Sequence, residues 1–310
     1  MERVLALKVL VTGGAGFIGS HTVDKLLDTG AEVLVVDDLS TGKRENLNPH
    51  AGFVRMDICS RYLSEEFNRF KPDFVVHLAA QVSVTRAVDD PVKDSMTNVV
   101  GTVNLLKNCL LHNVKRVVYA SSAAVYGNPG VDLITEGTAT VPLSFYGVSK
   151  LTPEYYLRVF SHLYGLHYTV LRYANVYGPR QDARGEAGVV SIFASKAASG
   201  ENPVIFGDGE QTRDFIFVGD VAAANIMAIH AGDRATLNIG TGKGTSINKL
   251  LTMICEITGV NLEPVFVEAR DSDIRHSRMD ITNTLACTDW RPQMTLKEGL
   301  TRTLEHYRTK

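Results

Sequence analysis

The amino-acid sequence predicts an α/β fold, in which a doubly wound parallel sheet is followed by a smaller C-terminal α/β lobe that binds a substrate. Its first half alternates short β-branched runs with amphipathic segments, the pattern of parallel strands joined by crossover helices. Several runs, such as 33–36, are almost wholly apolar, as in strands covered by helices on both faces. After about residue 178 the sequence becomes rich in Gly, Pro and charged residues. We therefore expect a first domain at 1–178 and a lobe at 179–310, some segments of which return to the core.

The individual elements follow from the periodicity of the apolar residues. Strands are expected at 7–12, 32–37, 52–56, 74–78, 115–120 and 167–173. Helices are expected at 18–29, 98–112, 149–164, 188–199, 219–231, 246–257 and 295–308. Helical spacing is clear at 98–112, where Val99, Val103, Leu106 and Leu110 share one face. We expect the helices at 98–112 and 149–164 to pack as a pair on one side of the sheet.

Composition narrows the class of partner. The chain has 310 residues, enough for a large core, and its 32 basic and 34 acidic residues leave a formal charge of -2. Such a balance gives no electrostatic basis for binding nucleic acid or an anionic membrane surface. We therefore expect a small-molecule substrate.

Cysteine usage and the N-terminus indicate a cytoplasmic protein. Cys59, Cys109, Cys255 and Cys287 are widely separated and form no CxxC pair, which argues against disulfides and against a zinc site. The N-terminus runs directly into a predicted strand without the apolar region of a signal peptide. No apolar run approaches the length needed to span a membrane. We expect neither a bound metal nor membrane insertion.

A glycine-rich turn joins the first predicted strand to the first predicted helix. In the segment TGGAGFIG at 12–19, Gly13, Gly16 and Gly19 are spaced for a tight turn and for close approach of a pyrophosphate to the helix N-terminus. Asp37 ends the second predicted strand, 18 residues after Gly19, where a carboxylate accepts hydrogen bonds from the ribose hydroxyls of adenosine. Its charge repels a 2′-phosphate. The pattern therefore predicts a Rossmann-type site for NAD rather than NADP.

A second pattern predicts the chemistry. Tyr146 and Lys150 are spaced i, i+4 at the start of a helix, so both side chains lie on one face. We expect the ammonium to stabilise the phenolate and to lower the tyrosine pKa from about 10 towards the working pH. Ser122, at the end of the fifth predicted strand, would orient a substrate hydroxyl and share its proton with Tyr146. The alternative is a surface Tyr–Lys pair beside a serine-rich strand end.

Together these motifs resemble the extended short-chain dehydrogenase/reductase family and, within it, the UDP-glucose 4-epimerases and related nucleotide-sugar epimerases. The resemblance spans nearly the whole chain, and its C-terminal markers are the segments LRYANVYG at 171–178, GEQTRDF at 209–215 and the stretch 270–277. The residues that it places around NAD are Gly13, Gly16, Phe17, Ile18, Gly19, Asp37, Asp38, Leu39, Ser40, Thr41, Gly42, Asp57, Ile58, Leu78, Ala79, Ala80, Gln81, Asn98, Tyr146, Lys150 and Tyr173. Those that it places around a UDP-sugar are Ser122, Tyr146, Asn175, Val190, Phe206, Arg213, Arg270, Asp273 and Ser277.

The resemblance implies C4 epimerisation of a UDP-sugar through a 4-keto intermediate, with NAD permanently bound, and a homodimer built on a four-helix bundle. Related 4,6-dehydratases carry an Asp-Glu pair where this chain has Ala123 and Ala124, so the acid and base for dehydration are missing. Ser277 stands where strict hexose epimerases have a bulky tyrosine, which leaves room for an N-acetyl group. Galactose use and surface-polysaccharide synthesis are both possible pathways.

Several alternatives stay open from the residues. The chain could act on a UDP-hexuronate, because the sequence does not show which group sits at C5. Asp57 and Ile58 could be a loop aspartate beside a packing isoleucine rather than adenine contacts. Taken alone, Arg213 beside Asp214 would be read as a surface ion pair. A redox sensor that binds NAD without catalysis is the alternative from a different class, and the presence of the Ser–Tyr–Lys trio argues against it.

Overall fold

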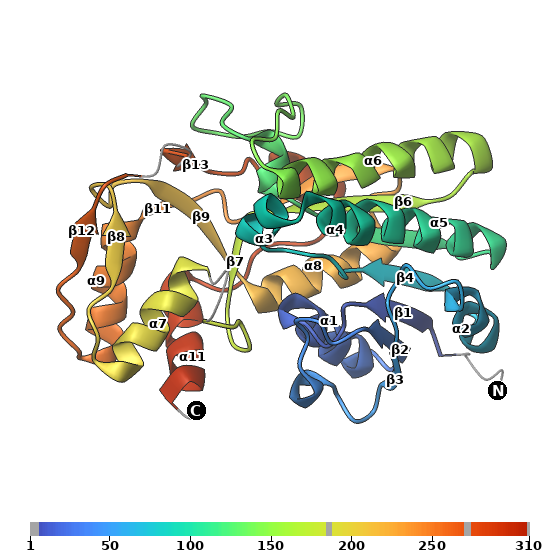
Figure 1. Ribbon diagram of the computed structural model, residues 1–310, viewed down its shortest axis with the longest axis horizontal. Helices are drawn as coiled ribbons and strands as arrows, with labels where there is room; N and C mark the ends of the chain where they lie inside the picture. The colour runs from blue at the N-terminus through green and yellow to red at the C-terminus, as the bar shows by residue number, and fades with distance from the viewer. Residues whose placement is uncertain (1–5, 184–187, 270–273, 309–310) are drawn as a thin grey trace.

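The computed structural model describes residues 6–183, 188–269 and 274–308. Its centre is a sheet of parallel strands in the order β10-β6-β5-β4-β1-β2-β3 (Figure 1). The strands are β1 Lys8–Thr12, β2 Glu32–Asp37, β3 Gly52–Arg55, β4 Phe74–His77, β5 Arg116–Ser122, β6 Tyr168–Tyr173 and β10 Ala235–Ile239. The six predicted strands are confirmed. The order reverses between β1 and β4, and such a switch point opens a crevice at the carboxyl ends of the strands.

Helices cover both faces of the sheet, as a doubly wound fold requires. α1 (Phe17–Asp28) and α8 (Val218–His230) pack on one face, where alternate strand residues such as Val9 and Val118 point. α2 (Leu63–Phe70), α5 (Gly101–Leu111) and α6 (Phe145–Tyr164) cover the opposite face, around Leu10 and Val117. The expected pairing of the helices at 98–112 and 149–164 is confirmed, because α5 contacts α6.

The C-terminal half contributes a smaller lobe, drawn at the left of Figure 1. One sheet of the lobe has the order β11-β9-β13, with β7 also paired to β9. Its strands are β7 Asn175–Tyr177, β9 Thr212–Phe217, β11 Gly244–Ser246 and β13 His276–Ser277, and a separate pair is β8 Val204–Phe206 with β12 Val265–Val267. α7 (Val189–Ser199), α9 (Ile247–Thr258) and α11 (Leu296–Arg308) enclose an apolar core against β9. The domain boundary at 178 stays a prediction, although β10 and α8, from beyond it, belong to the main sheet and its covering layer.

Two predicted helices differ from their expected bounds by more than one residue. α6 begins at Phe145 rather than 149, because the Ser144 side chain caps it by accepting a hydrogen bond from the Gly147 N–H at 3.0 Å. The helix expected at 98–112 is preceded by a π-helical turn, Met96–Val100 (η2), and by the short helices α3 (Val84–Asp89) and α4 (Pro91–Ser95). α10 (Thr282–Cys287) was also not expected. Across the described ranges, no helix is both long and apolar enough to cross a membrane.

Candidate active site

A cleft of about 930 Å³ opens at the carboxyl ends of the central strands. Most of the residues that the sequence analysis assigned to NAD and to catalysis line it. They are Gly13, Gly16, Phe17, Ile18, Gly19, Asp37, Asp38, Ser40, Thr41, Gly42, Asp57, Ile58, Leu78, Ala79, Ala80, Gln81, Ser122, Tyr146, Lys150 and Tyr173. Two others, Leu39 and Asn98, are not among its lining residues. The fold thus brings segments from β1 to β6 to a single site.

The glycine-rich turn has no space for side chains. Gly13 has a φ of +72°, and a Cβ there would lie 2.6 Å from the backbone nitrogen of Ala79. A Cβ on Gly19 would lie 2.0 Å from the carbonyl oxygen of Gly13. Gly16 is the N-cap of α1, so the unpaired N–H groups of the first helical turn border the cleft. This cradle fits a pyrophosphate, which binds best where backbone N–H groups are free and no side chain intervenes.

Asp37 sits at the end of β2 and is 7% exposed. Its two carboxylate oxygens accept the N–H groups of Ala15 and Leu39, each at 2.9 Å. Burial outweighs these hydrogen bonds and raises the pKa of Asp37 above its usual value. Each carboxylate oxygen keeps a second lone pair, so the group can also accept a ribose hydroxyl from the cleft.

The remaining residues assigned to the cofactor fall into two groups. Asp57 accepts the Cys59 N–H at 2.7 Å, and Ile58 is buried beside Gly101, while both line the cleft. Asn98 lies behind the wall, where its amide accepts the N–H of Gln81 at 2.8 Å and donates to the Gln81 carbonyl at 2.9 Å. Asn98 therefore fixes the backbone of a lining residue.

Ser122, Tyr146 and Lys150 all line the cleft. Ser122 ends β5, and its hydroxyl forms a hydrogen bond with the Tyr146 phenol and accepts the Ala124 N–H at 3.2 Å. Lys150 is 4% exposed, and its Nζ lies 4.9 Å from the centre of the Tyr119 ring. The trio therefore has the arrangement of a proton-transfer site, with a phenol, a hydroxyl that bonds to it and an ammonium one turn along α6.

The expected pKa of Tyr146 was wrong. Burial raises the pKa of Tyr146 to about 12, although the hydrogen bond with Ser122 lowers it. Burial also lowers the pKa of Lys150 to about 8, against the raising effects of Glu154 and Asp94. Desolvation outweighs the Ser122 hydrogen bond, and the Tyr146 pKa is not lowered by the Lys150 ammonium that the i, i+4 spacing suggested. The protein's own residues thus leave Tyr146 protonated at neutral pH.

Of the residues assigned to the UDP-sugar, Ser122 and Tyr146 line this cleft, whereas Asn175, Val190, Phe206, Arg213 and Ser277 are not among its lining residues. Asn175, Arg213 and Ser277 lie on the neighbouring strands β7, β9 and β13, and Ser277 is in register with Arg213. Arg213 donates to the backbone carbonyls of Thr212 at 2.9 Å and Ile274 at 2.5 Å, which replaces the surface ion pair weighed above. The other assigned positions are Val190, buried on α7, and Phe206, at the end of β8. Arg270 and Asp273 lie outside the described residues.

The cleft also has lining residues that sequence reasoning missed. Lys43 and Asp182 form an ion pair of 3.1 Å between the loop after β2 and the loop that enters the lobe. Arg180 and Gln181, from the same entering loop, line the cleft as well. Lys43 directly follows the assigned segment 40–42, so its proximity was a usable signal, whereas nothing in the sequence placed 180–182 opposite it.

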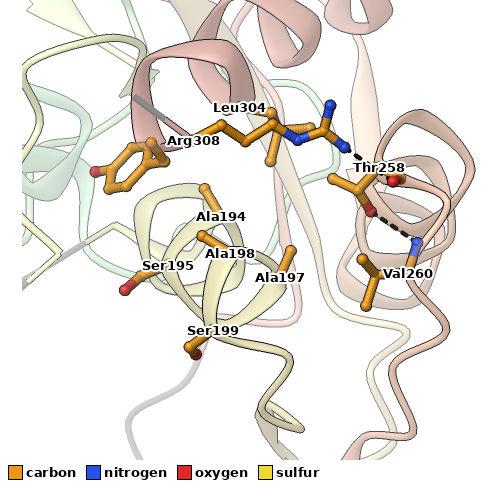
Figure 2. A pocket seen from close by; sticks show the side chains of 10 residues that line it. Ala194, Ser195, Ala197, Ala198, Ser199, Thr258, Val260, Leu304 and Arg308 are labelled. Carbon is orange, nitrogen blue, oxygen red and sulfur yellow. Dashed lines mark hydrogen bonds between the residues drawn. The ribbon is translucent and has the colours of Figure 1, made fainter. Parts of the chain in front are cut away.

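A second cavity, of about 500 Å³, lies between α7, α9 and α11 in the lobe. Figure 2 shows Ala194, Ala197 and Leu304 around it, and the Arg308 guanidinium donates to the Thr258 carbonyl at 2.8 Å. None of the residues assigned to cofactor or chemistry lines it, so we place the active site in the larger cleft. In the part of the chain that the structure describes, no cluster of three His, Cys, Asp or Glu side chains could hold a metal ion.

Comparison with known proteins gives consistent results. The model of the NAD dependent epimerase/dehydratase family matches residues 9–240. The UDP-glucose 4-epimerase of Mycolicibacterium smegmatis is 44% identical over 98% of this chain and 99% of that protein. The solved UDP-glucose 4-epimerase of Thermotoga maritima, with UDP-glucose, has a TM-score of 0.95 at 46% identity over 98% of this chain and 99% of that one. The UDP-glucose 4-epimerase of Thermus thermophilus, in complex with NAD, has a TM-score of 0.92 at 41% identity over 97% and 99%.

Proposed function

Because this chain belongs to the NAD dependent epimerase/dehydratase family, we propose that it is an isomerase that epimerises a UDP-sugar at C4, through a 4-keto intermediate and with bound NAD. One observation carries the proposal: Ser122, Tyr146 and Lys150 lie in the same cleft as the glycine cradle and Asp37. A hydride acceptor held against a proton-transferring trio can oxidise and reduce one carbon reversibly. Similarity to UDP-glucose 4-epimerases over nearly the full chain supports this chemistry.

The residues of the cleft fit NAD. The cradle of Gly13, Gly16 and Gly19 and the N-terminus of α1 would hold the pyrophosphate, and Asp37 would accept the adenosine ribose hydroxyls. Asp57 and Ile58 would flank the adenine. When bound, NAD supplies the hydride acceptor and, in its oxidised form, a positive charge near the catalytic trio.

Tyr146 is the group that moves the substrate proton. Its phenolate would take the proton of the C4 hydroxyl as the C4–H bond breaks, and its phenol would return the proton to the other epimer. Ser122 would orient the same hydroxyl through its bond to Tyr146. Lys150 stays charged at neutral pH and would stabilise the phenolate, which the pKa of about 12 makes unfavourable without help.

Epimerisation requires the 4-keto sugar to rotate within the active site without dissociating from the protein. We infer that Arg213, together with Arg270, holds the pyrophosphate of UDP in the lobe, because guanidinium groups form forked, charge-assisted hydrogen bonds with phosphates. Asn175, Val190, Phe206 and Asp273 would complete the nucleotide contacts. The sugar would extend from this anchor into the cleft and rotate between its two faces. Ala123 and Ala124 continue directly from Ser122 in a short 3₁₀ helix, and neither can act as an acid or a base for dehydration.

We propose UDP-glucose and UDP-galactose as substrates and N-acetylated forms as additional ones. Ser277 is small and only 8% exposed, and it is in register with Arg213, the proposed pyrophosphate ligand. Replacing Ser277 by tyrosine would fill the space of the N-acetyl group. We expect this variant to lose turnover of UDP-N-acetylgalactosamine and to retain that of UDP-galactose, and equal losses on both would remove the assignment. A UDP-hexuronate remains the alternative substrate.

A homodimer is the proposed assembly. The outward face of α6 exposes an apolar stripe that includes Val148, Tyr155, Val159 and Leu163, each at least half exposed. Further exposed apolar side chains on the adjacent segments are Val84, Val88, Val92, Met96, Val100 and Leu111. Contiguous exposed apolar side chains mark protein interfaces. Two copies that face each other across a twofold axis would bury α5 and α6 of each chain, four helices in all. Light scattering should give a dimer for the protein and a monomer for Val159→Arg.

We propose that the reaction takes place in the cytoplasm, in galactose use or in surface-polysaccharide synthesis. All four cysteines are unpaired thiols, as is usual for proteins of a reducing compartment.

Incubation with single substrates tests the proposed function. Purified protein would receive UDP-galactose, UDP-N-acetylgalactosamine or UDP-glucuronate, without added NAD, and the sugars would be identified after hydrolysis. Conversion of one sugar to its C4 epimer is the expected result, and it would identify the substrate class. If none is converted, even with NAD supplied, the proposal is wrong.

A further inference from the structure

Asp94 is a buried carboxylate to which neither the sequence analysis nor the mechanism above gives a role. It lies in the short helix α4, just before the π-helical turn η2, and is 1% exposed. π-Helical turns are frequent at functional sites. Burying a carboxylate is unfavourable unless a partner compensates for the hydration that it loses. Its retention therefore needs an explanation.

One oxygen of Asp94 anchors a polar network beneath the cleft. Oδ1 accepts Gln81 Nε2 at 3.0 Å and Asn98 Nδ2 at 3.2 Å. Asn98 Nδ2 also donates to Ser149 Oγ at 2.9 Å, and that hydroxyl donates to the backbone carbonyl of Tyr146 at 3.1 Å. Asp94 is thus connected to a wall of the cleft through Gln81 and to the first turn of α6 through Ser149.

The other oxygen of Asp94 has no such role. Oδ2 is buried and has no hydrogen-bond partner within the described ranges. Anchoring Gln81 and Asn98 requires only one acceptor, which an asparagine would provide equally well. The carboxylate differs from the amide in its charge and in having a second acceptor where the amide has a donor. Since that second acceptor makes no hydrogen bond among the described residues, the network by itself does not account for an aspartate at this position.

The charges around Asp94 are those of the catalytic pair and its neighbours. The titratable groups that interact with Asp94 or with this pair are Tyr146, Lys150 and Glu154 on α6, Tyr119 on β5 and His77 on β4. Burial lowers the pKa of His77 to about 3, so it is neutral. Glu154 is already paired with Arg172 at 2.6 Å. Asp94 is therefore the one carboxylate of this set whose charge acts on both Tyr146 and Lys150.

We propose that Asp94 is a positioning residue: its first oxygen holds the hydrogen-bond network that joins the wall of the cleft to the first turn of α6, and its buried charge acts on the Tyr146 and Lys150 side chains of that helix. This inference rests on the proposed function. A nearby negative charge favours the protonated form of any group, so it keeps Lys150 charged and also opposes ionisation of Tyr146. Asp94 accordingly raises the pKa of both groups. Its removal should therefore move both titrations to lower pH.

Asp94→Asn is the variant that separates the charge from the hydrogen bonds. The control is Asp89→Asn, the same chemical change at an exposed position of α3. Three quantities would be compared with the unaltered protein: the pH profile of kcat for UDP-galactose, the tyrosinate absorbance titration against Tyr146→Phe, and the NAD bound per chain. We expect Asp94→Asn to bind NAD, to shift both limbs of the profile to lower pH by about one unit, and to ionise Tyr146 at lower pH. Asp89→Asn should leave all three unchanged.

A purely structural role would reduce kcat at every pH and leave the midpoints in place, and that result would overturn the proposal. If Asp94→Asn does not fold, Asp94→Ser removes the charge with less volume and is read in the same way. If Asp94→Glu folds and the Asn and Ser variants do not, the role of Asp94 is to stabilise the fold. That result would also overturn the proposal. Inactivity of the unaltered protein on UDP-sugars would instead refute the proposed function, so the two failures are distinguishable.

Discussion

Gly19→Ala should expel the cofactor from the cleft. The new Cβ would lie 2.0 Å from the Gly13 carbonyl oxygen and 2.8 Å from Gly14 Cα, whereas real Cβ atoms essentially never approach within 3.0 Å. The backbone would have to separate by about 1 Å, and all three of the nearest atoms belong to the turn itself rather than to a flexible side chain. The strain therefore falls on the segment that is proposed to hold the pyrophosphate.

The size of the effect follows from this crowding. Inserting one carbon into a packed site typically costs about 1–3 kcal/mol. If binding requires the native turn, this cost appears as a loss of NAD affinity of roughly 5- to 140-fold. If the turn relaxes irreversibly, the same cost lowers the free energy of unfolding instead. Gly137→Ala is the matched control, because Gly137 is exposed and the nearest atom to its new Cβ would be 3.7 Å away.

The assay is the amount of NAD released per chain when each purified variant is denatured, followed by titration of the stripped protein with NAD. We expect close to one NAD per chain for the unaltered protein and for Gly137→Ala, and a deficit for Gly19→Ala. Thermal unfolding measured in parallel separates loss of affinity from loss of fold. Full NAD content with unchanged thermal stability in Gly19→Ala would refute the argument from crowding.

Three further predictions concern the catalytic trio and the buried charges beside it. Tyr146→Phe should retain bound NAD and lose turnover by about 10²–10⁴-fold, because it removes the proton-transfer group, and a normal rate in a coupled epimerase assay would exclude that role. Turnover should fall as the pH rises through about 8, since Lys150 then loses its proton and no longer stabilises a phenolate. A basic limb that is unchanged in Lys150→Arg, which stays charged, would show that another group titrates there. Glu154→Gln should destabilise the fold by about 3–5 kcal/mol in urea unfolding, because glutamine keeps an acceptor but no charge and so leaves the Arg172 guanidinium, 2% exposed, without the counter-ion that lies 2.6 Å from it. Arg172→Met in the same chain should recover part of the loss, and a double variant no more stable than Glu154→Gln would contradict this explanation.

The sequence predicted the elements with strong periodicity and missed those that depend on tertiary packing. Apolar strands such as β2 and β4 could be located directly from their residues. β10 could not, because Thr236 and Asn238 interrupt the apolar residues of Ala235–Ile239, which becomes a sheet strand by pairing with β6. The start of α6 was placed late, since its first turn contains Gly147 and its position depends on the cap by Ser144.

The residues of the candidate site also fall into those that local sequence motifs predict and those that depend on tertiary contacts. Residues of local motifs, such as the glycine turn and the pair Tyr146 and Lys150, could be predicted because their spacing carries the geometry. Asp182, which pairs with Lys43, could not, because contacts between distant loops leave no periodic signal. The predicted lowering of the Tyr146 pKa was wrong, because the i, i+4 spacing describes the attraction of an ammonium but not the desolvation of the phenol, which depends on packing.

The fate of the hydrogen at C4 tests the central claim most directly. UDP-galactose carrying deuterium at C4 would be incubated with the purified protein in ordinary water without added NAD, and the product would be analysed by mass spectrometry and NMR. If the reaction is a reversible oxidation at C4 with a tightly held cofactor, the product is UDP-glucose that retains deuterium at C4. Product with the deuterium lost to solvent, or an absolute need for added NAD in every turnover, would contradict it.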